Sequence, residues 1–361
     1  TYCADSCANN RVDNRTTNRR YGFILAALFL AGCLFFAGCT GGTGSTTDKN
    51  GQGNGGGNGN ITGQGFPVTV EDSFGRTVHI EQEPQRIITL APGNTEIVYA
   101  LGLQDKLVGV TKYCNYPVEA LEKEKIGGYS DPNIEKIISL NPDLIFATRE
   151  HREFVPEFEN IGINVVILQT TTVDGVLDIV GLAGEATGRT DEANAVISTM
   201  REKIELVDGK IKNVPEESKP SVYYEVFDEP IMTAGPGTPT HDIITRAGGI
   251  NVAADADNTY PQYSMEVLVK KNPEVIIAAK YNMEIQTGVE AMTAEEMDRH
   301  DAQVIENIKQ RAGWTAISAV TNDRVYLIDD DLITADGPRV ADGLVAMAKI
   351  LYPDKFADQT N

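Results

Sequence analysis

The chain has 361 residues, enough for two α/β lobes and a terminal tail, and its 52 Asp and Glu against 31 Lys and Arg give a formal net charge of −21. A chain this acidic is not expected to bind nucleic acid, because phosphate backbones are bound by basic surfaces. Of its five cysteines only Cys114 follows residue 39, so the sequence predicts no disulfide within the folded part.

The N-terminal segment, residues 1–38, has the pattern of a lipoprotein signal. The positively charged residues Arg15, Arg19 and Arg20 precede an apolar run at 21–38. Small residues close this run directly before Cys39, so we expect Cys39 to be the lipidated first residue of the mature protein. The alternative is an uncleaved membrane anchor, since an apolar run of this length nearly spans a bilayer.

Residues 39–65 consist mostly of Gly, Asn, Thr, Ser and Gln. Because the segment has almost no apolar side chains to pack, we expect it to form a flexible tether. With either kind of anchor, the rest of the chain is expected outside the membrane, at the cell surface or in the periplasm.

Beyond the tether, apolar runs alternate with turn residues in the way that is typical of a parallel sheet covered by helices. The elements expected in this first half are a hairpin at 68–80, a strand at 86–90, a helix at 95–101 capped by Asn94, a strand at 107–110, a helix near 153–160 and a strand at 165–168.

One phrase of the sequence occurs twice, at 133–145 and at 264–276. Each copy has an apolar residue, a Glu, apolar residues at helical spacing, then Asn-Pro, an acid and an apolar run. Because proline ends a helix, each copy predicts a short helix, a turn and a buried strand. Glu135 and Glu266 fall in the first helical turn, where the helix dipole alone favours a carboxylate. The matched pair, however, predicts two similar lobes.

The longest periodic helix, 190–212, is expected to begin at a Thr190 cap and stands between the two copies of the phrase. We therefore place a first lobe at 66–188, a connecting helix at 189–213 and a second lobe at 214–361. The second lobe is expected to contain strands at 222–226, 231–235 and 325–328 and helices at 242–247, 293–311 and 338–351. The predicted fold class is α/β, with two lobes of mostly parallel sheet flanked by helices.

Several short motifs, in this order, resemble those of the substrate-binding proteins of ABC importers that take up cobalamin and ferric siderophores. The motifs are Asp72-Ser73-Phe74-Gly75-Arg76, Arg86-Ile87-Ile88, Asn94-Thr95-Glu96, Leu101-Gly102, Asn133-Ile134-Glu135, Asn141-Pro142-Asp143, Thr233-Ala234-Gly235, Gly248-Gly249-Ile250-Asn251 and Pro338-Arg339. The resemblance implies a periplasmic binding protein of the helical-backbone type, with a ligand held between the lobes. It also implies that one Glu on each lobe docks onto the permease, and the matching positions are Glu135 and Glu266.

Within this family, the loop Tyr113-Cys114-Asn115-Tyr116-Pro117 is most similar to the cobalamin-binding branch, in which an aromatic residue of this loop packs on the corrin. By the same resemblance Tyr129 is a second aromatic of the cleft. Broad planar ligands suit aromatic walls, because aromatic faces bury much area at little entropic cost. The full set of expected ligand-binding residues is Asn94, Tyr113, Asn115, Tyr116, Tyr129, Arg149, Tyr263 and Asp330.

Other tyrosines of the second lobe either face the cleft or fill the core, namely Tyr223, Tyr224, Tyr260 and Tyr281. Asp329, Asp330 and Asp331 either bond ligand amides or form a solvated turn. Cys114 is expected to be a small packed residue and not a ligand of cobalt.

The expected ligand is a corrinoid, with a ferric siderophore as the alternative. Corrinoids are largely neutral, whereas an anionic ferric complex would need clustered arginines beside so many acids. Arg149 and His151, which follow a strand end, favour the ferric alternative.

No resident cofactor or metal is expected. The four histidines show no paired spacing, which argues against a zinc- or manganese-binding receptor. The remaining alternative is an enzyme that would use His241 and Asp242. No nucleophile elbow or phosphate loop accompanies them, so the sequence favours a binding protein.

Overall fold

The structure is a computed structural model that describes residues 65–280 and 293–357. The expected signal segment, Cys39 and the tether up to residue 64 lie outside these residues, as does Tyr281. Within the described ranges, every helix is too short or too polar to span a bilayer.

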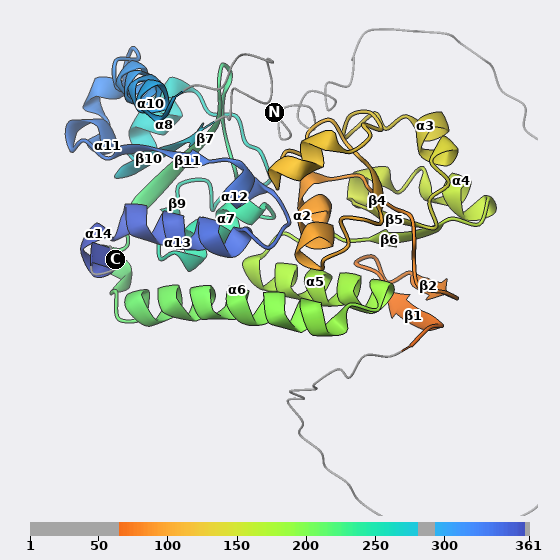
Figure 1. The fold of residues 1–361 in the computed structure, drawn as a ribbon. Coiled ribbons are helices and arrows are strands. Elements are labelled where there is room, and N and C mark those ends of the chain that lie inside the picture. The colour runs from red at the N-terminus through yellow and green to blue at the C-terminus, as the bar shows by residue number, and fades with distance from the viewer. Residues whose placement is uncertain (1–64, 281–292, 358–361) are drawn as a thin grey trace, which may run out of the picture. The chain divides into compact units, whose positions relative to one another are not determined.

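The first lobe contains a four-stranded parallel sheet in the order β4-β3-β5-β6 (Figure 1). Its strands are β3 (Ile87–Thr89), β4 (Leu107–Val110), β5 (Leu144–Ala147) and β6 (Asn164–Ile167). The predicted hairpin is formed by β1 (Val68–Glu71) and β2 (Thr77–Ile80). The helices of this lobe are α2 (Pro92–Ala100), α3 (Ile134–Ser139), α4 (Val155–Asn160) and α5 (Val173–Thr187), with short 3₁₀ turns η1 (Val118–Glu122) and η2 (Arg149–His151).

The second lobe repeats this plan around the strand order β11-β10-β7-β8, with β9 also beside β7. Only β8 runs antiparallel to its neighbour. The strands are β7 (Ser221–Asp228), β8 (Ile231–Thr233), β9 (Ile250–Asn251), β10 (Val275–Lys280) and β11 (Val325–Asp329). The helices are α7 (Pro239–Arg246), α8 (Met265–Lys271), α10 (Ala294–Lys309), α11 (Ser318–Thr321), α12 (Asp331–Thr334), α13 (Val340–Leu351) and α14 (Pro353–Phe356), with 3₁₀ turns η3 (Glu216–Ser218) and η4 (Trp314–Ala316).

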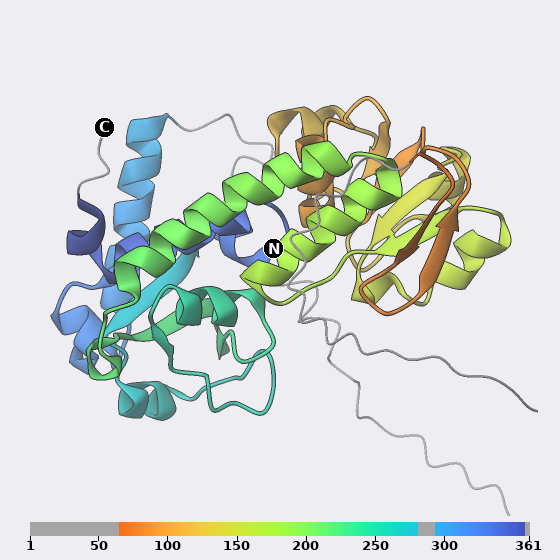
Figure 2. The same ribbon diagram turned by 90° about the horizontal axis from the view of Figure 1, so that it is seen from below.

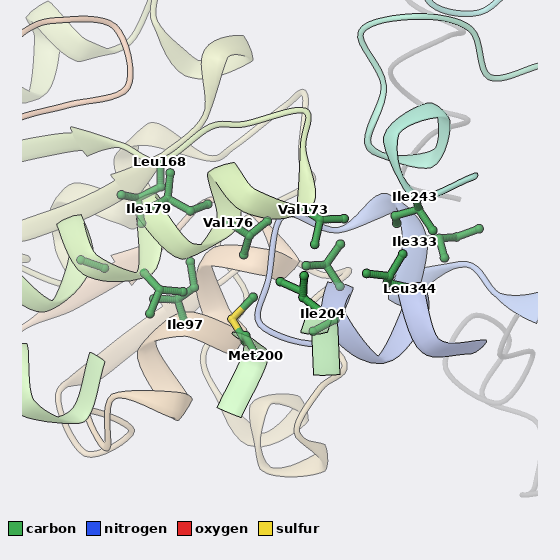
Figure 3. Close-up of a cluster of buried hydrophobic side chains, with 14 of the residues drawn as sticks. Ile97, Leu168, Val173, Val176, Ile179, Met200, Ile204, Ile243, Ile333 and Leu344 are labelled. Carbon is green, nitrogen blue, oxygen red and sulfur yellow. The ribbon is translucent and has the colours of Figure 1, made fainter. Parts of the chain in front are cut away.

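The connecting helix α6 (Thr190–Ile211) packs against α5 of the first lobe and α13 of the second. In Figure 2 this long green helix runs across both lobes. One continuous hydrophobic core joins them through it, and Figure 3 shows Ile97 and Val176 of the first lobe, Met200 and Ile204 of α6, and Leu344 of the second. The fold class predicted from the sequence is therefore confirmed.

The repeated phrase forms the predicted helix, turn and strand in both lobes. Ile137 of α3 and Leu268 of α8 are fully buried, so each helix is fastened by its apolar face. The asparagine before each proline has a left-handed backbone, with φ 46° at Asn141 and 45° at Asn272. Asparagine tolerates this conformation better than most residues, and it lets the chain leave the helix toward the strand.

The acid that follows each Asn-Pro ties the phrase to the neighbouring strand. Asp143 accepts hydrogen bonds from the backbone N–H groups of Gln85 and Arg86, just before β3. Glu274 accepts one from the N–H of Ser221, where β7 begins. In both lobes, these hydrogen bonds tie the chain just before the strand of the phrase to the start of the neighbouring strand.

Three predicted helix starts were wrong, and one of them is that of α7, which begins at Pro239 after a Thr238 cap and not at residue 242. The first helix begins at Pro92 after an Ala91 cap, because proline at the first helical position already has the φ that a helix needs. Asn94 therefore lies inside the first turn, and its amide donates to the carbonyl of Ala147 at 3.1 Å. At α6 the cap position is Arg189, and Thr190 is already helical without a side-chain cap.

Candidate functional site

The two lobes meet where residues 330–339, which we call the interlobe segment, lie against α2 (Figure 1). The backbones approach so closely that only glycine fits at position 93, and Gly337 lies directly against the Glu96 carboxylate. A Cβ on Gly93 would lie 2.6 Å from the backbone of Asp336, and one on Gly337 would lie 2.7 Å from Oε2 of Glu96. The second lobe is therefore in direct contact with the first turn of the helix that follows the first strand of the parallel sheet.

Side chains bond across the same junction. The amide of Asn115 donates to Oδ2 of Asp331 at 2.9 Å. The amide of Gln169 donates to Oδ2 of Asp336 at 2.7 Å. These bonds connect loops at the carboxyl ends of first-lobe strands, where α/β sheets bind ligands, to the interlobe segment.

Arg339 makes the most enclosed contact of the junction. Its Nη2 donates to Oε1 of Glu96 at 2.6 Å, and its guanidinium lies 3.8 Å from the centroid of the Tyr116 ring. Glu96 is only 4% exposed. Burial raises the pKa of Glu96 to about 7, although the Arg339 guanidinium opposes the rise.

A cavity of about 730 Å³ lies beside this contact and is lined by residues of both lobes. Tyr99 and Tyr116 provide its aromatic surface, while Glu119 and Glu122 add acidic groups from η1. Asp336 adds a further carboxyl to the junction, and burial raises its pKa to about 7.

Of the expected ligand-binding residues, those of the loop after β4 lie at the junction. Tyr116 is 47% exposed, and every other Phe, Tyr or Trp side chain among the described residues is less exposed. Tyr113 is half-buried, with the ammonium of Lys112 4.8 Å from its ring centroid. Asn115 bonds to the second lobe, as described, and Asn94 is buried in α2.

Tyr129 lies inside the first lobe and is only 4% exposed. Its hydroxyl donates to Glu150 at 2.6 Å, and the ring of His151 packs edge-on at 5.0 Å. His151 donates through Nε2 to the carbonyl of Tyr129 and accepts the Thr148 N–H at Nδ1, and burial lowers its pKa. The structure thus holds Tyr129 in a buried polar network, and its role in ligand binding stays a prediction.

The two expected residues of the second lobe are also bonded within their own lobe. The Tyr263 hydroxyl donates to the carbonyl of Val252 at 3.3 Å. Asp330 accepts hydrogen bonds from the hydroxyls of Tyr224 at 2.6 Å and Thr334 at 3.3 Å, and burial raises its pKa. Tyr223 and Tyr224 are core residues, and Tyr260 is half-buried.

Arg149 is exposed beside β5, and its guanidinium lies 5.9 Å from the ring centroid of Phe74. Cys114 is buried, and the hydroxyls of Thr95 and Thr111 contact its sulfur at 3.1 and 3.2 Å. Among residues 65–280 and 293–357, no three His, Cys, Asp or Glu side chains are grouped as metal ligands.

Glu135 and Glu266 lie on the exposed sides of α3 and α8. Neither has an ion-pair or hydrogen-bond partner through its carboxylate among the described residues. Both helices lie at the top of the view in Figure 1, one on each lobe.

Sequence reasoning missed the role of Glu96, Asp336 and Arg339 at the junction. Glu96 and Arg339 occur in the motifs Asn94-Thr95-Glu96 and Pro338-Arg339, but they are 243 residues apart and no spacing rule pairs them. Their pairing is a property of how the two lobes pack.

Comparison with known proteins gives consistent results. The protein family described as periplasmic binding protein matches residues 87–332. An uncharacterised ABC transporter substrate-binding lipoprotein of Bacillus subtilis, YvrC, is 34% identical over 299 residues, or 81% of this chain and 88% of that protein. A cobalamin-binding protein of Halobacterium salinarum is 30% identical over 293 residues, or 80% and 74%. The crystal structure of the periplasmic vitamin B12 binding protein BtuF of Vibrio cholerae has a TM-score of 0.61 at 30% identity and covers 75% of this chain and 97% of its own.

The raised pKa of Asp336 predicts a pH-dependent stability. Between its ordinary pKa of 3.8 and its folded pKa of about 7, the folded protein binds a proton that the unfolded chain has lost. The contribution of this carboxyl to the free energy of unfolding is fully present below pH 3.8 and is lost as the pH rises through 7. Asp336→Asn cannot ionise and keeps an acceptor oxygen for Gln169. We expect the variant to be more stable than the parent by about 1–3 kcal/mol at pH 8 but not at pH 4.

Urea denaturation at both pH values measures this difference, with Asp354→Asn in the exposed part of α14 as the control. A stability difference between the Asp336→Asn variant and the parent that is the same at both pH values contradicts the assignment.

Proposed function

The chain belongs to the periplasmic binding protein family, and on that premise we propose that it captures a corrinoid between its lobes and delivers it to an ABC importer. Like its relatives, it is a solute-binding protein and not an enzyme. Its partners are the permease subunits of the importer. The choice of ligand class rests mainly on the acidic interlobe junction.

The charges at the junction support a neutral or cationic ligand. Carboxylates of Glu96, Asp331 and Asp336 lie there, and the one buried guanidinium among the described junction residues, that of Arg339, is already paired with Glu96. An anion enclosed beside these groups would lose its hydration next to carboxylates, and the guanidinium nearest to it is already paired. A corrinoid is largely neutral, and its rim of amides suits partners such as Asn115 and Asp331.

We assign the first contacts to Tyr113, Asn115 and Tyr116, because their loop follows β4 and lies against the second lobe. Exposed aromatic faces cover a flat macrocycle at little entropic cost. The remaining members of the proposed site are Asn94, Tyr129, Arg149, Tyr263 and Asp330. The names of two similar proteins, which describe binding of cobalamin and of vitamin B12, support the same ligand class.

A ferric siderophore is the second candidate, and one observation favours it. Arg149 and Arg152 are exposed, and both guanidinium groups lie near the ring of Phe74, at 5.9 and 4.7 Å. Two adjacent guanidinium groups suit an anionic chelate. They lie on the first lobe alone, however, whereas the interlobe junction is lined by carboxylates.

Titration of the purified protein with cobalamin, cobinamide and a panel of ferric siderophores tests the ligand class. We expect tight binding of a corrinoid and weaker binding by Tyr113→Ala, with a loss of about 1–3 kcal/mol for the lost aromatic platform. Isothermal titration calorimetry measures both. Tight binding of a siderophore without any response to corrinoids contradicts the proposal.

We also propose that Glu135 and Glu266 dock onto the permease. Both are exposed first-turn glutamates without a partner among the described residues, on matching helices of the two lobes. An exposed carboxylate of this kind is available to a guanidinium on another protein. Two such contacts on one partner act together, so losing both costs more than losing either.

Glu135→Ala and Glu266→Ala are therefore expected to leave ligand affinity unchanged while weakening binding to the reconstituted permease about tenfold each. The double variant is expected to bind more weakly still, as measured by binding to permease in nanodiscs. Glu157→Ala and Glu295→Ala, exposed first-turn glutamates of α4 and α10, serve as matched controls. If the controls weaken permease binding equally, the effect belongs to net charge and not to docking.

We further propose that a lipid on Cys39 anchors the protein. The apolar run before Cys39 supports this, as does the description of the similar Bacillus subtilis protein as a lipoprotein. In cells, Cys39→Ala is expected to shift the mature protein from the membrane fraction to the soluble fraction, or to leave its precursor unprocessed. A variant that stays in the membrane at its mature size rules out this anchor.

A further inference from the structure

The same three-part arrangement of arginine, carboxylate and aromatic ring occurs twice among the described residues. In the second lobe, Arg311 pairs with Glu225 and lies 4.7 Å from the centroid of the Trp314 ring. All three of these residues belong to the second lobe, and Trp314 is part of its buried core.

The second occurrence is divided between the lobes. Arg339 comes from the interlobe segment, whereas Glu96 belongs to α2 and Tyr116 to the loop after β4. The guanidinium is closer to its ring here, at 3.8 Å, and its side chain is 17% exposed against 27% for Arg311. One lobe therefore supplies the cation and the other supplies both the anion and the ring.

This division has a consequence for Tyr116. The guanidinium covers part of the ring, and Glu96 fixes the guanidinium in turn. The rest of the ring is open, since Tyr116 remains 47% exposed. Among residues 65–280 and 293–357, Glu96 forms a salt bridge with the arginine of the other lobe and with no other residue.

We propose that Arg339 is a positioning residue that holds the Tyr116 ring in place only while the lobes are in contact, and so couples ligand retention on this ring to lobe closure. The inference rests on the proposed function, in that the open part of the ring faces the ligand. Lobe separation withdraws the guanidinium from both Glu96 and the ring, which frees the ring and releases the ligand.

Arginine is required at this position because the planar guanidinium stacks on a ring while its edge donates to a carboxylate. Lysine keeps the charge but provides no plane, so Arg339→Lys is expected to keep the pairing with Glu96 and lose the stacking. Arg339→Gln loses both. The two variants therefore separate the contribution of the charge from that of ring positioning.

Stopped-flow dissociation of cobalamin from the full-length protein is the main test. We expect Arg339→Gln to speed dissociation about tenfold with an unchanged association rate. The dissociation rate of Arg339→Lys is expected to lie between those of the parent and of Arg339→Gln. Tyr116→Ala is expected to speed dissociation to a similar extent. The double variant with Arg339→Gln and Tyr116→Ala is expected to dissociate no faster than the faster of the two single variants. Arg311→Gln is the matched control, expected to lower stability but to leave dissociation unchanged. Additive effects of the Arg339 and Tyr116 variants, or parent-like dissociation from Arg339→Gln, overturn the proposal.

Hydrogen exchange of the ligand-free protein tests the same contact without any ligand. In Arg339→Gln the amides of residues 112–123 and 335–343 are expected to exchange faster, while those of α3 and β10 are unchanged. If the parent binds no corrinoid but this exchange pattern appears, the proposed ligand fails and the interlobe contact stands. Unchanged exchange at 112–123 overturns the role of Arg339, whatever the ligand.

Discussion

The hydrophobic core that both lobes share is the constraint on which the rest of the structure depends. Two sheets that were independent would be free to separate, but Val176 of α5 and Leu344 of α13 belong to one buried cluster with Ile204 of α6. Opening the lobes widely would expose part of this cluster to water, at about 25 cal/mol for each Å² of apolar surface. Relative motion is therefore restricted to the part of the junction that is polar, around α2 and the interlobe segment.

The polar part of the junction contains several carboxylates. Enclosing charged carboxylates away from water costs free energy. Glu96 and Asp336 both have pKa values of about 7, so near neutral pH a fraction of each is protonated instead of charged. Partial protonation and the Arg339 ion pair reduce the cost of enclosing them. A ligand bound beside these groups adds least to the cost if it carries no negative charge, and a corrinoid meets this condition better than an anionic chelate.

The sequence predicted the lobes and the connecting helix because those depend on periodicity and on a repeated phrase, both of which are local. It did not predict α5, whose Gly175, Gly181 and Gly184 lower helix propensity. Packing explains these glycines in part, since a Cβ on Gly184 would lie 2.5 Å from the Cβ of Ala193 on α6. The pairing of Glu96 with Arg339 and the burial of Tyr129 also depend on contacts between distant segments, which no local pattern encodes.

The repeated phrase contains residues that the fold explains and two residues that it leaves exposed. Its apolar residues are buried, its asparagines adopt the left-handed turn, and its acids after Asn-Pro bond to the neighbouring strand. The fold therefore accounts for each of these repeated features. Glu135 and Glu266 are exposed, and no ion pair within the described residues uses them. The helix dipole favours a first-turn carboxylate in either helix, so the fold accounts for an acid at each position but does not require an exposed Glu at both.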